Sequence, residues 1–208
     1  MVNRAVARSP QKSMLAEKLA SGICSSLPAW IPLRASVVRR PWALTPEAYG
    51  KFLCGLFDVY YRDWVNGDYT SVRLFDDYIH MAMGMPAGTC ATSGSCGAYF
   101  VVEGDGTVYP CDFYCLDEWK MGRIGEQSIP ELANSEKARL FLQQGERKPD
   151  ACADCRWYSL CHGGCKRDWV ENDGKLENYS CLAFKEFFAY AESRILEIAR
   201  AEAEYYRR

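Results

Sequence analysis

Residues 152–165 read CADCRWYSLCHGGC and place four cysteines in fourteen positions, with the spacing Cys-x2-Cys-x5-Cys-x3-Cys. Taken alone, this run is compatible with a disulfide knot, a zinc site, a redox pair or part of an iron-sulfur site. Each interpretation implies a different protein, so the fold and the function depend on what the rest of the chain adds to these four thiols.

The composition favours metal binding over disulfides. The chain has 208 residues, of which 49% are hydrophobic, and its net charge of -2 gives no indication of a nucleic-acid or membrane-surface protein. No apolar run reaches the ~20 residues that cross a bilayer, and charges interrupt the N-terminus where a secretory segment would be apolar. We therefore predict a cytoplasmic protein, in which the eleven cysteines stay reduced and available to metal.

Charge separates the beginning of the chain from the rest. Residues 1–42 hold seven Lys and Arg and one acid, Glu17, whereas residues 43–208 hold 18 Lys and Arg and 26 acids. The first part also lacks helical or strand periodicity and contains two prolines in SSLPAWIPLR. We predict that residues 1–41 form a basic segment that is poorly ordered or unrelated to the domain.

A helix and a strand are predicted next. Thr45 is a favourable N-cap and Pro46 suits the first helical position, so a helix is expected from there to Gly67. The sequence SVRLFD at positions 71–76 has the apolar alternation of a short strand. The apolar side chains at helical spacing in the first element are Leu53, Leu56, Phe57, Tyr60 and Trp64.

A β-hairpin is predicted around the turn sequence GDG at positions 104–106. Glycine and aspartate are the residue types that tolerate the backbone of a tight turn, and β-branched and aromatic residues flank them. We expect residues 99–103 to pair with residues 107–111. The pairing would bring Cys96 and Cys111 to the same end of a small sheet.

Three helical stretches follow. Ser128 and Glu131 form a capping-box signal, and a second helix is expected over residues 135–144. An amphipathic helix is expected at the C-terminus, with these apolar side chains at helical spacing: Phe184, Phe187, Phe188, Ala191, Ile195, Leu196 and Ile198.

Eight cysteines form an ordered pattern, namely Cys90, Cys96, Cys111, Cys152, Cys155, Cys161, Cys165 and Cys181. Eight thiols make two sets of four, and four thiolates suit either a tetrahedral zinc ion or a cubane iron-sulfur cluster. Gly163 and Gly164 let the chain pass close to a bulky inorganic centre. The other thiols, Cys24, Cys54 and Cys115, are predicted to be ordinary buried or surface residues.

Several common active sites are poorly supported. His80 and His162 are the only histidines, which disfavours a histidine-rich metal site or a histidine-centred triad. The sequence also lacks the glycine-rich loops that bind nucleotide phosphates.

Three stretches carry a family resemblance: CGAYFVVEGDGTVYPCDFY, CADCRWYSLCHGGCKRD and NYSCLAFKEFF. Together they closely resemble the C-terminal region of anaerobic sulfatase-maturating enzymes, which are radical SAM proteins with a SPASM auxiliary-cluster domain. The resemblance covers about residues 42–200. It implies an α+β fold, in which residues 42–85 are the last helix and strand of a partial (β/α) barrel, residues 86–185 a SPASM domain and residues 186–208 a C-terminal helix.

The resemblance also implies a cofactor and a reaction. It assigns Cys90, Cys96, Cys111 and Cys165 to one 4Fe-4S cluster and Cys152, Cys155, Cys161 and Cys181 to a second. The family oxidises a Cys or Ser side chain of a sulfatase to Cα-formylglycine, using a radical made from S-adenosyl-L-methionine (SAM). Asp112 matches a family residue proposed to accept a proton. From the residues alone, Asp112 fits equally well as a turn residue that hydrogen-bonds backbone N–H groups.

The chain departs from the family in one respect. It contains no Cys-x3-Cys-x2-Cys spacing, the loop that holds the SAM-cleaving cluster in radical SAM enzymes. We therefore expect a C-terminal fragment of a longer enzyme that is inactive alone, with SAM and a third 4Fe-4S cluster only in the full-length protein.

Two alternatives remain open. The chain could be a zinc-stabilised module that docks on a partner protein through two four-cysteine sites, or a free-standing ferredoxin-like electron carrier. The predicted partners of the family reading are a sulfatase polypeptide as substrate and an electron-transfer protein, with no nucleic acid and no membrane.

Overall fold

The computed structural model describes residues 23–24, 44–68, 70–97 and 99–207. The described helices are α3 (Pro46–Val65), α4 (Arg73–Ala82), α5 (Cys90–Ser93), α6 (Ile129–Ala133), α7 (Glu136–Glu146), α8 (Tyr158–Cys161) and α9 (Cys181–Tyr205). The described strands are β1 (Ile23–Cys24), β2 (Ser71–Val72), β3 (Val101–Val102), β4 (Thr107–Tyr109), β5 (Gly122–Arg123), β6 (Trp169–Asn172) and β7 (Lys175–Asn178). Four short 3-10 helices complete them: η2 (Asp112–Tyr114), η3 (Asp117–Trp119), η4 (Asp150–Cys152) and η5 (Lys166–Asp168).

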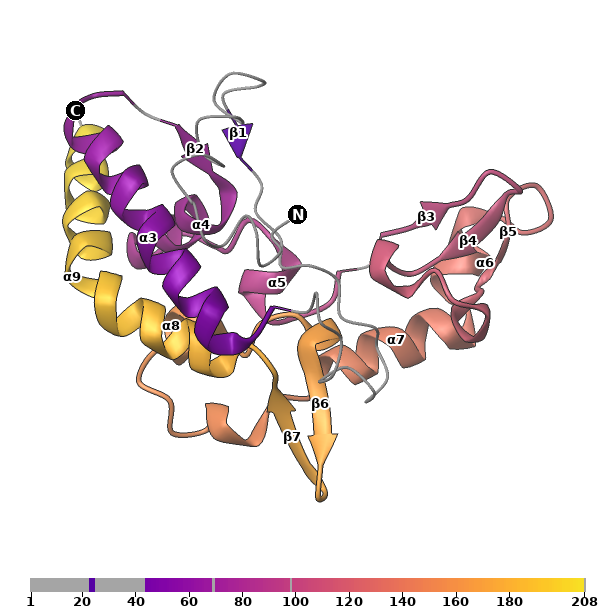
Figure 1. Cartoon of the computed structure of the whole chain (residues 1–208). Coiled ribbons are helices and arrows are strands. Elements are labelled where there is room, and N and C mark those ends of the chain that lie inside the picture. The colour runs from indigo at the N-terminus through magenta and orange to yellow at the C-terminus, as the bar shows by residue number, and fades with distance from the viewer. Residues whose placement is uncertain (1–22, 25–43, 69, 98, 208) are drawn as a thin grey trace.

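The prediction for residues 1–41 lies almost entirely outside the described residues. Only β1 is described there, and it pairs in parallel with β2. The fold class is the mixed helix-and-sheet arrangement that the sequence predicts, with small sheets and a long C-terminal helix (Figure 1). None of the described helices is long and apolar enough to cross a membrane.

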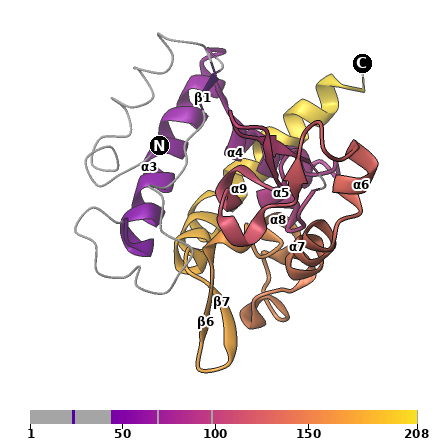
Figure 2. The same ribbon diagram turned by 90° about the vertical axis from the view of Figure 1, so that its right-hand side faces the viewer.

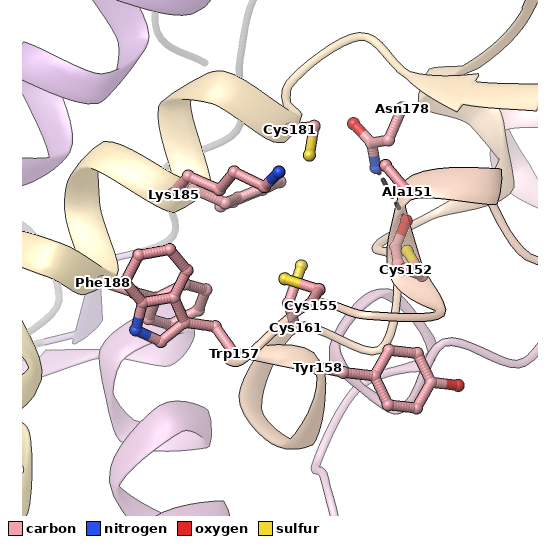
Figure 3. A pocket seen from close by; sticks show the side chains of 12 residues that line it. Ala151, Cys152, Cys155, Trp157, Tyr158, Cys161, Asn178, Cys181, Lys185 and Phe188 are labelled. Carbon is pink, nitrogen blue, oxygen red and sulfur yellow. Dashed lines mark hydrogen bonds between the residues drawn. The ribbon is translucent and has the colours of Figure 1, made fainter.

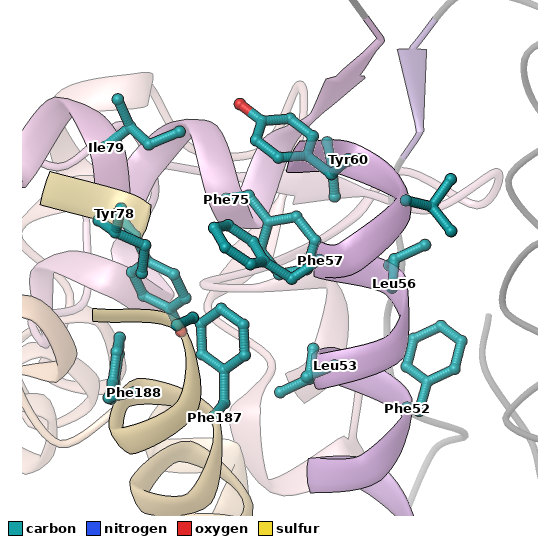
Figure 4. Packing of buried hydrophobic residues seen from close by; sticks show 14 of the residues in the cluster. Phe52, Leu53, Leu56, Phe57, Tyr60, Phe75, Tyr78, Ile79, Phe187 and Phe188 are labelled. Carbon is teal, nitrogen blue, oxygen red and sulfur yellow. The ribbon is translucent and has the colours of Figure 1, made fainter. Parts of the chain in front are cut away.

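Helices from distant parts of the sequence enclose the main hydrophobic core. α3 and α9 lie side by side, and α4 packs against α9 (Figure 1). Phe187 on α9 is fully buried, and its ring centroid lies 5.5 Å from that of Phe57 and 5.4 Å from that of Phe75 (Figure 4). Trp157 and Cys161 pack against this same core, so the cysteine run rests on a rigid base.

The caps of α3 explain its boundaries. The Thr45 side chain accepts a hydrogen bond from the Ala48 N–H at 3.2 Å, and Pro46 opens the helix, as predicted. The helix ends before Gly67, whose φ of 73° is in the left-handed region that glycine tolerates.

The strand prediction for residues 71–76 is wrong for most of its length. Only Ser71–Val72 is strand, and α4 begins at Arg73. Phe75, Tyr78 and Ile79 follow the i, i+3, i+4 spacing of a helix, and all three are buried. The apolar alternation around Arg73 is therefore the first turn of an amphipathic helix.

The hairpin prediction is confirmed. β3 and β4 are antiparallel, with Val101 opposite Tyr109 and Val102 opposite Val108. The turn closes at Gly106, where φ is 85°, and the Asp105 carboxylate accepts hydrogen bonds from the N–H and hydroxyl groups of Thr107. β5 adds a third strand that was not predicted, because it has no β-branched residue to indicate it.

The later helices follow their predicted signals with small changes. Ser128 and Glu131 form the full capping box of α6, and α7 covers the predicted stretch. α9 begins at Cys181, earlier than the predicted boundary of its domain. Leu196 is 38% exposed, contrary to its predicted place on the apolar face, because Ile195 beside it already points into the core.

A second hairpin, β6–β7, was not predicted. It extends away from the helices in both views (Figures 1 and 2). Its turn is Asp173–Gly174, with φ values of 48° and 77°, which is a strong sequence signal for a tight hairpin. This hairpin matters for the site because, along the sequence, it lies between the cysteine run and Cys181.

Candidate metal centre

One group of four thiols surrounds a single pocket. Cys152, Cys155, Cys161 and Cys181 line it, together with aromatic side chains and Lys185 (Figure 3). Cys152 comes from η4, Cys161 ends α8 and Cys181 opens α9. We call these four residues the second thiol group.

The turn after Cys161 holds this group together. His162 and Gly163 have φ values of 49° and 86°, so the chain reverses immediately after α8. The Gly163 carbonyl then accepts hydrogen bonds from Trp169 Nε1 and Asn178 Nδ2, each at 2.8 Å. Asn178 Oδ1 accepts from the Ser180 N–H at 2.7 Å, and this fixes the start of α9 beside the turn.

The other four predicted thiols form the first thiol group. They are Cys90, Cys96, Cys111 and Cys165, contributed by α5, the segment after it, the end of the β3–β4 hairpin and the end of the cysteine run. Cys96 packs against the buried cluster that contains Cys111, which is consistent with the predicted hairpin. Cys90 lies close enough to Cys96 and Cys165 to affect the pKa of both.

The two groups meet through a few polar contacts. His162 Nδ1 lies 2.8 Å from the carbonyl oxygen of Thr92 on α5, so the turn beside Cys161 contacts the helix that carries Cys90. Lys148 donates to the Gly94 carbonyl and lies near thiols of both groups, Cys96 and Cys152. The sites are therefore neighbours.

Burial disfavours the thiolate form at several of these cysteines. The cysteine side chains that the structure describes form no disulfide. Burial raises the pKa of Cys161 and of Cys165 to about 12, and that of Cys111 to about 11. Because a thiolate is the ligand form, bound metal would supply positive charge that offsets the cost of this burial.

The predicted metal ligands are all cysteine sulfurs. Across the described ranges, no three His, Cys, Asp or Glu side chains are arranged to hold one metal ion. Each thiol group nevertheless provides the four sulfurs that an iron-sulfur cluster takes, and a cubane distributes these over four irons. The chemistry of the donors fits an iron-sulfur cluster.

Asp112 lies beside the first thiol group. It is exposed, opens η2 and lines a cavity of about 250 Å³ that also contacts Cys90 and Cys165. The Tyr99 hydroxyl donates to Asp112 Oδ1 at 3.3 Å and lies 3.4 Å from Cys111 Sγ. The carboxylate thus reaches both the thiol group and an open cavity.

Sequence reasoning missed Lys166. Its side chain is buried, and the ammonium lies 3.4 Å from the ring centroid of Phe141. Burial lowers the pKa of Lys166 to about 8, while nearby Cys96, Cys111 and Cys165 act in the opposite direction. Cysteine spacing gives no signal for this contact.

The chain is similar to several known proteins. Residues 94–156 match the SPASM family, which is described as an iron-sulfur cluster-binding domain. This part of the chain is therefore similar to a SPASM iron-sulfur cluster-binding domain.

The individual relatives share a more specific description than the domain does. The chain is similar to anaerobic sulfatase-maturating enzymes: it is 39% identical to the cysteine-type enzyme of Clostridium perfringens over 170 residues, 81% of this chain and 46% of that enzyme. It is 30% identical to the serine-type enzyme of Bacteroides thetaiotaomicron over 155 residues, 72% of this chain and 36% of that enzyme.

A solved structure agrees with these relatives. The structure described as native anSMEcpe with bound AdoMet and Cp18Cys peptide superposes with a TM-score of 0.88 at 35% identity, and covers 96% of this chain and 56% of that one. The chain spans about half the length of the curated relatives or less.

Proposed function

We propose that this chain is the auxiliary-cluster region of an enzyme that oxidises a Cys or Ser side chain of a sulfatase to Cα-formylglycine. The cysteine-type and serine-type names of its relatives support this reaction, and so do the AdoMet and peptide bound in the related structure. The radical-generating loop is not in the sequence, so the chain is expected to be inactive alone.

The crossing of the two thiol groups carries the proposal. Three cysteines of the run lie in the second group, whereas Cys165 lies with the first. We assign one 4Fe-4S cluster to each group. When bound, such a cluster accepts and releases one electron. All four ligands of each cluster would be protein thiolates, which favours electron transfer and structural roles over direct binding of substrate.

Anaerobic reconstitution tests this assignment. The chain made without oxygen is expected to turn brown and to bind about eight irons, four in each thiol group. Iron and sulfide analysis with EPR of the reduced protein measures the result. The control is a chain with Cys54 replaced by Ala, since Cys54 lies among the core residues of α3 and should leave the iron content unchanged.

Two outcomes contradict the proposal. Colourless protein that retains zinc in a fixed ratio under the same treatment would establish the zinc-stabilised module instead. Protein with full iron that exchanges electrons with a reductase, but fails to restore activity when it replaces the matching part of a relative, would indicate a free-standing electron carrier.

Asp112 is proposed to accept the proton that leaves the substrate. Its carboxylate faces the cavity beside the first thiol group, where a side chain undergoing oxidation could approach it. The Tyr99 hydroxyl donates to one oxygen of this carboxylate at 3.3 Å and so orients it. A positioned carboxylate at such a point contributes about 100-fold to 10,000-fold to a rate.

Replacing Asp112 by Asn tests this role. We expect unchanged iron content but at least about a 100-fold loss of formylglycine formation, measured by mass spectrometry of a sulfatase peptide. The assay uses a chimera in which residues 44–208 replace the corresponding part of the Clostridium perfringens enzyme. Asp117→Asn is the matched control, because the Asp117 side chain is 92% exposed and the substitution removes the same charge. Normal turnover by the Asp112→Asn chimera would refute the proposal.

A further inference from the structure

Lys166 has an unusual environment for a lysine. It is the second residue after the last glycine of the cysteine run and only 8% exposed. Its ammonium donates a hydrogen bond to the Phe141 carbonyl at 2.8 Å. The nitrogen also lies 4.9 Å from the ring centroid of Tyr114 and 5.2 Å from that of Trp119. Buried lysines are rare unless their charge has partners.

The three aromatic rings form a cage. Tyr114, Trp119 and Phe141 come from η2, η3 and α7, and each pair packs edge to face with centroids 5.1 to 5.8 Å apart. Aromatic faces attract a cation, so the cage offsets part of the solvation that Lys166 loses. The cage also limits the positions that the ammonium can occupy.

The cage places this charge against the first thiol group. Cys96, Cys111 and Cys165 all lie within electrostatic range of Lys166, and Cys111 packs in the same buried cluster as Tyr114 and Phe141. Asp168 also lies near Cys165, but its carboxylate is paired with Arg167 at 3.1 Å. Lys166 therefore supplies a buried positive charge to this group.

The second thiol group also has a lysine beside it, Lys185, but this lysine is less buried than Lys166. Lys185 extends into its pocket near Cys181, but this side chain is only half-buried (Figure 3). Glu177, an exposed acid, acts on the same thiol in the opposite direction. Water screens such charges more strongly than it screens a caged one. The two groups thus differ in the positive charge held beside them.

We propose that Lys166 raises the reduction potential of the iron-sulfur cluster in the first thiol group above that of the second. This inference rests on the cluster assignment in the proposed function. A 4Fe-4S cluster with four thiolates goes from a net charge of -2 to -3 when it takes up one electron. A fixed ammonium nearby stabilises the more negative state, because net charge and surroundings set the potential of a cluster. Lys166 is thus a positioning residue that acts through the cluster.

Substitution of Lys166 tests the proposal in the reconstituted full chain. Lys166→Met removes the charge at similar volume, and Lys166→Gln also keeps a donor for the Phe141 carbonyl. Both should lower the equilibrium constant for one-electron reduction of the first cluster by at least about tenfold, which corresponds to 59 mV. EPR-monitored titration with dithionite measures the potentials. Lys185→Met is the control and should leave the first cluster unchanged.

Each outcome is decisive. Lys166 variants that bind iron fully and keep the original potentials overturn this inference but not the proposed function, whereas an unaltered chain without iron overturns the proposed function itself. If the Lys166 variants bind no iron, the reduction potentials are measured instead in two chains that each keep a single cluster. The Cys152→Ala/Cys181→Ala chain must then show a higher potential than the Cys96→Ala/Cys111→Ala chain, and an equal or lower value refutes the inference.

Discussion

Replacing Cys165 by Ala is expected to remove one iron-sulfur cluster, whereas replacing Cys161 by Ala, four residues earlier, removes the other. The iron content should fall from about eight to about four in both variants. The loss should however affect different clusters, since Cys161 lines the pocket of the second thiol group and Cys165 lies with Cys90, Cys96 and Cys111.

The geometry of the turn between Cys161 and Cys165 explains why the two substitutions should remove different clusters. Gly163 and Gly164 both have positive φ angles, of 86° and 69°, so the chain changes direction sharply after Cys161. A Cβ at Gly164 would lie 2.7 Å from Asn178 Nδ2, which leaves no room for another residue type. Two neighbouring thiols are thus directed to different sites.

A double substitution identifies which cluster is lost. Cys165→Ala combined with Cys96→Ala should lose no more iron than either change alone, because both remove the same cluster. Cys165→Ala combined with Cys181→Ala should lose nearly all iron. If the first pair loses nearly all iron and the second pair only half, the assignment of Cys165 is wrong.

Gly145→Ala has the second large expected effect. Alanine in a helix is normally more stable than glycine by about 1 kcal/mol, so this change should stabilise α7 on propensity alone. At Gly145, however, a Cβ would lie 2.7 Å from Cys96 Sγ and 2.9 Å from Cys96 Cβ. Cys96 must therefore move, and we expect the first cluster to be lost with about half of the iron.

The neighbouring position provides the control. Gln144 is exposed on the same helix, so Gln144→Ala should retain the full iron content. Iron analysis and EPR of both variants, reconstituted side by side, measure the difference. A Gly145→Ala chain with complete iron and an unchanged first-cluster signal would contradict the close approach of α7 to Cys96.

Local signals predicted the elements whose boundaries depend on local contacts. The Thr45 cap, the GDG turn and the Ser128–Glu131 capping box each act within a few residues, and the structure has all three. The segment from Arg73 was misassigned because six residues of alternation fit both a strand and the first turn of a helix. The Asp173–Gly174 sequence is a usable local signal for the second hairpin, because both residues tolerate the positive φ angles of a tight turn.

The site was predictable only in part. Cysteine spacing indicated two sets of four thiols, but the division between the sets came from the family resemblance. The contacts of Lys166 could not be predicted, because Tyr114, Trp119 and Phe141 come from three separate elements that only tertiary packing brings together. The need for glycine at position 145 likewise appears only when Cys96 lies against α7.

The position of Cys181 would couple the proposed cluster binding to folding. It is the first residue of α9, and the same helix fills the main core through Phe187. A metal bound only by the folded state adds its binding free energy to the stability of the fold. If the second thiol group holds the cluster proposed for it, iron loading and helix packing are thermodynamically linked, and a chain that loses this cluster would also lose an anchor of α9, the longest of the described helices.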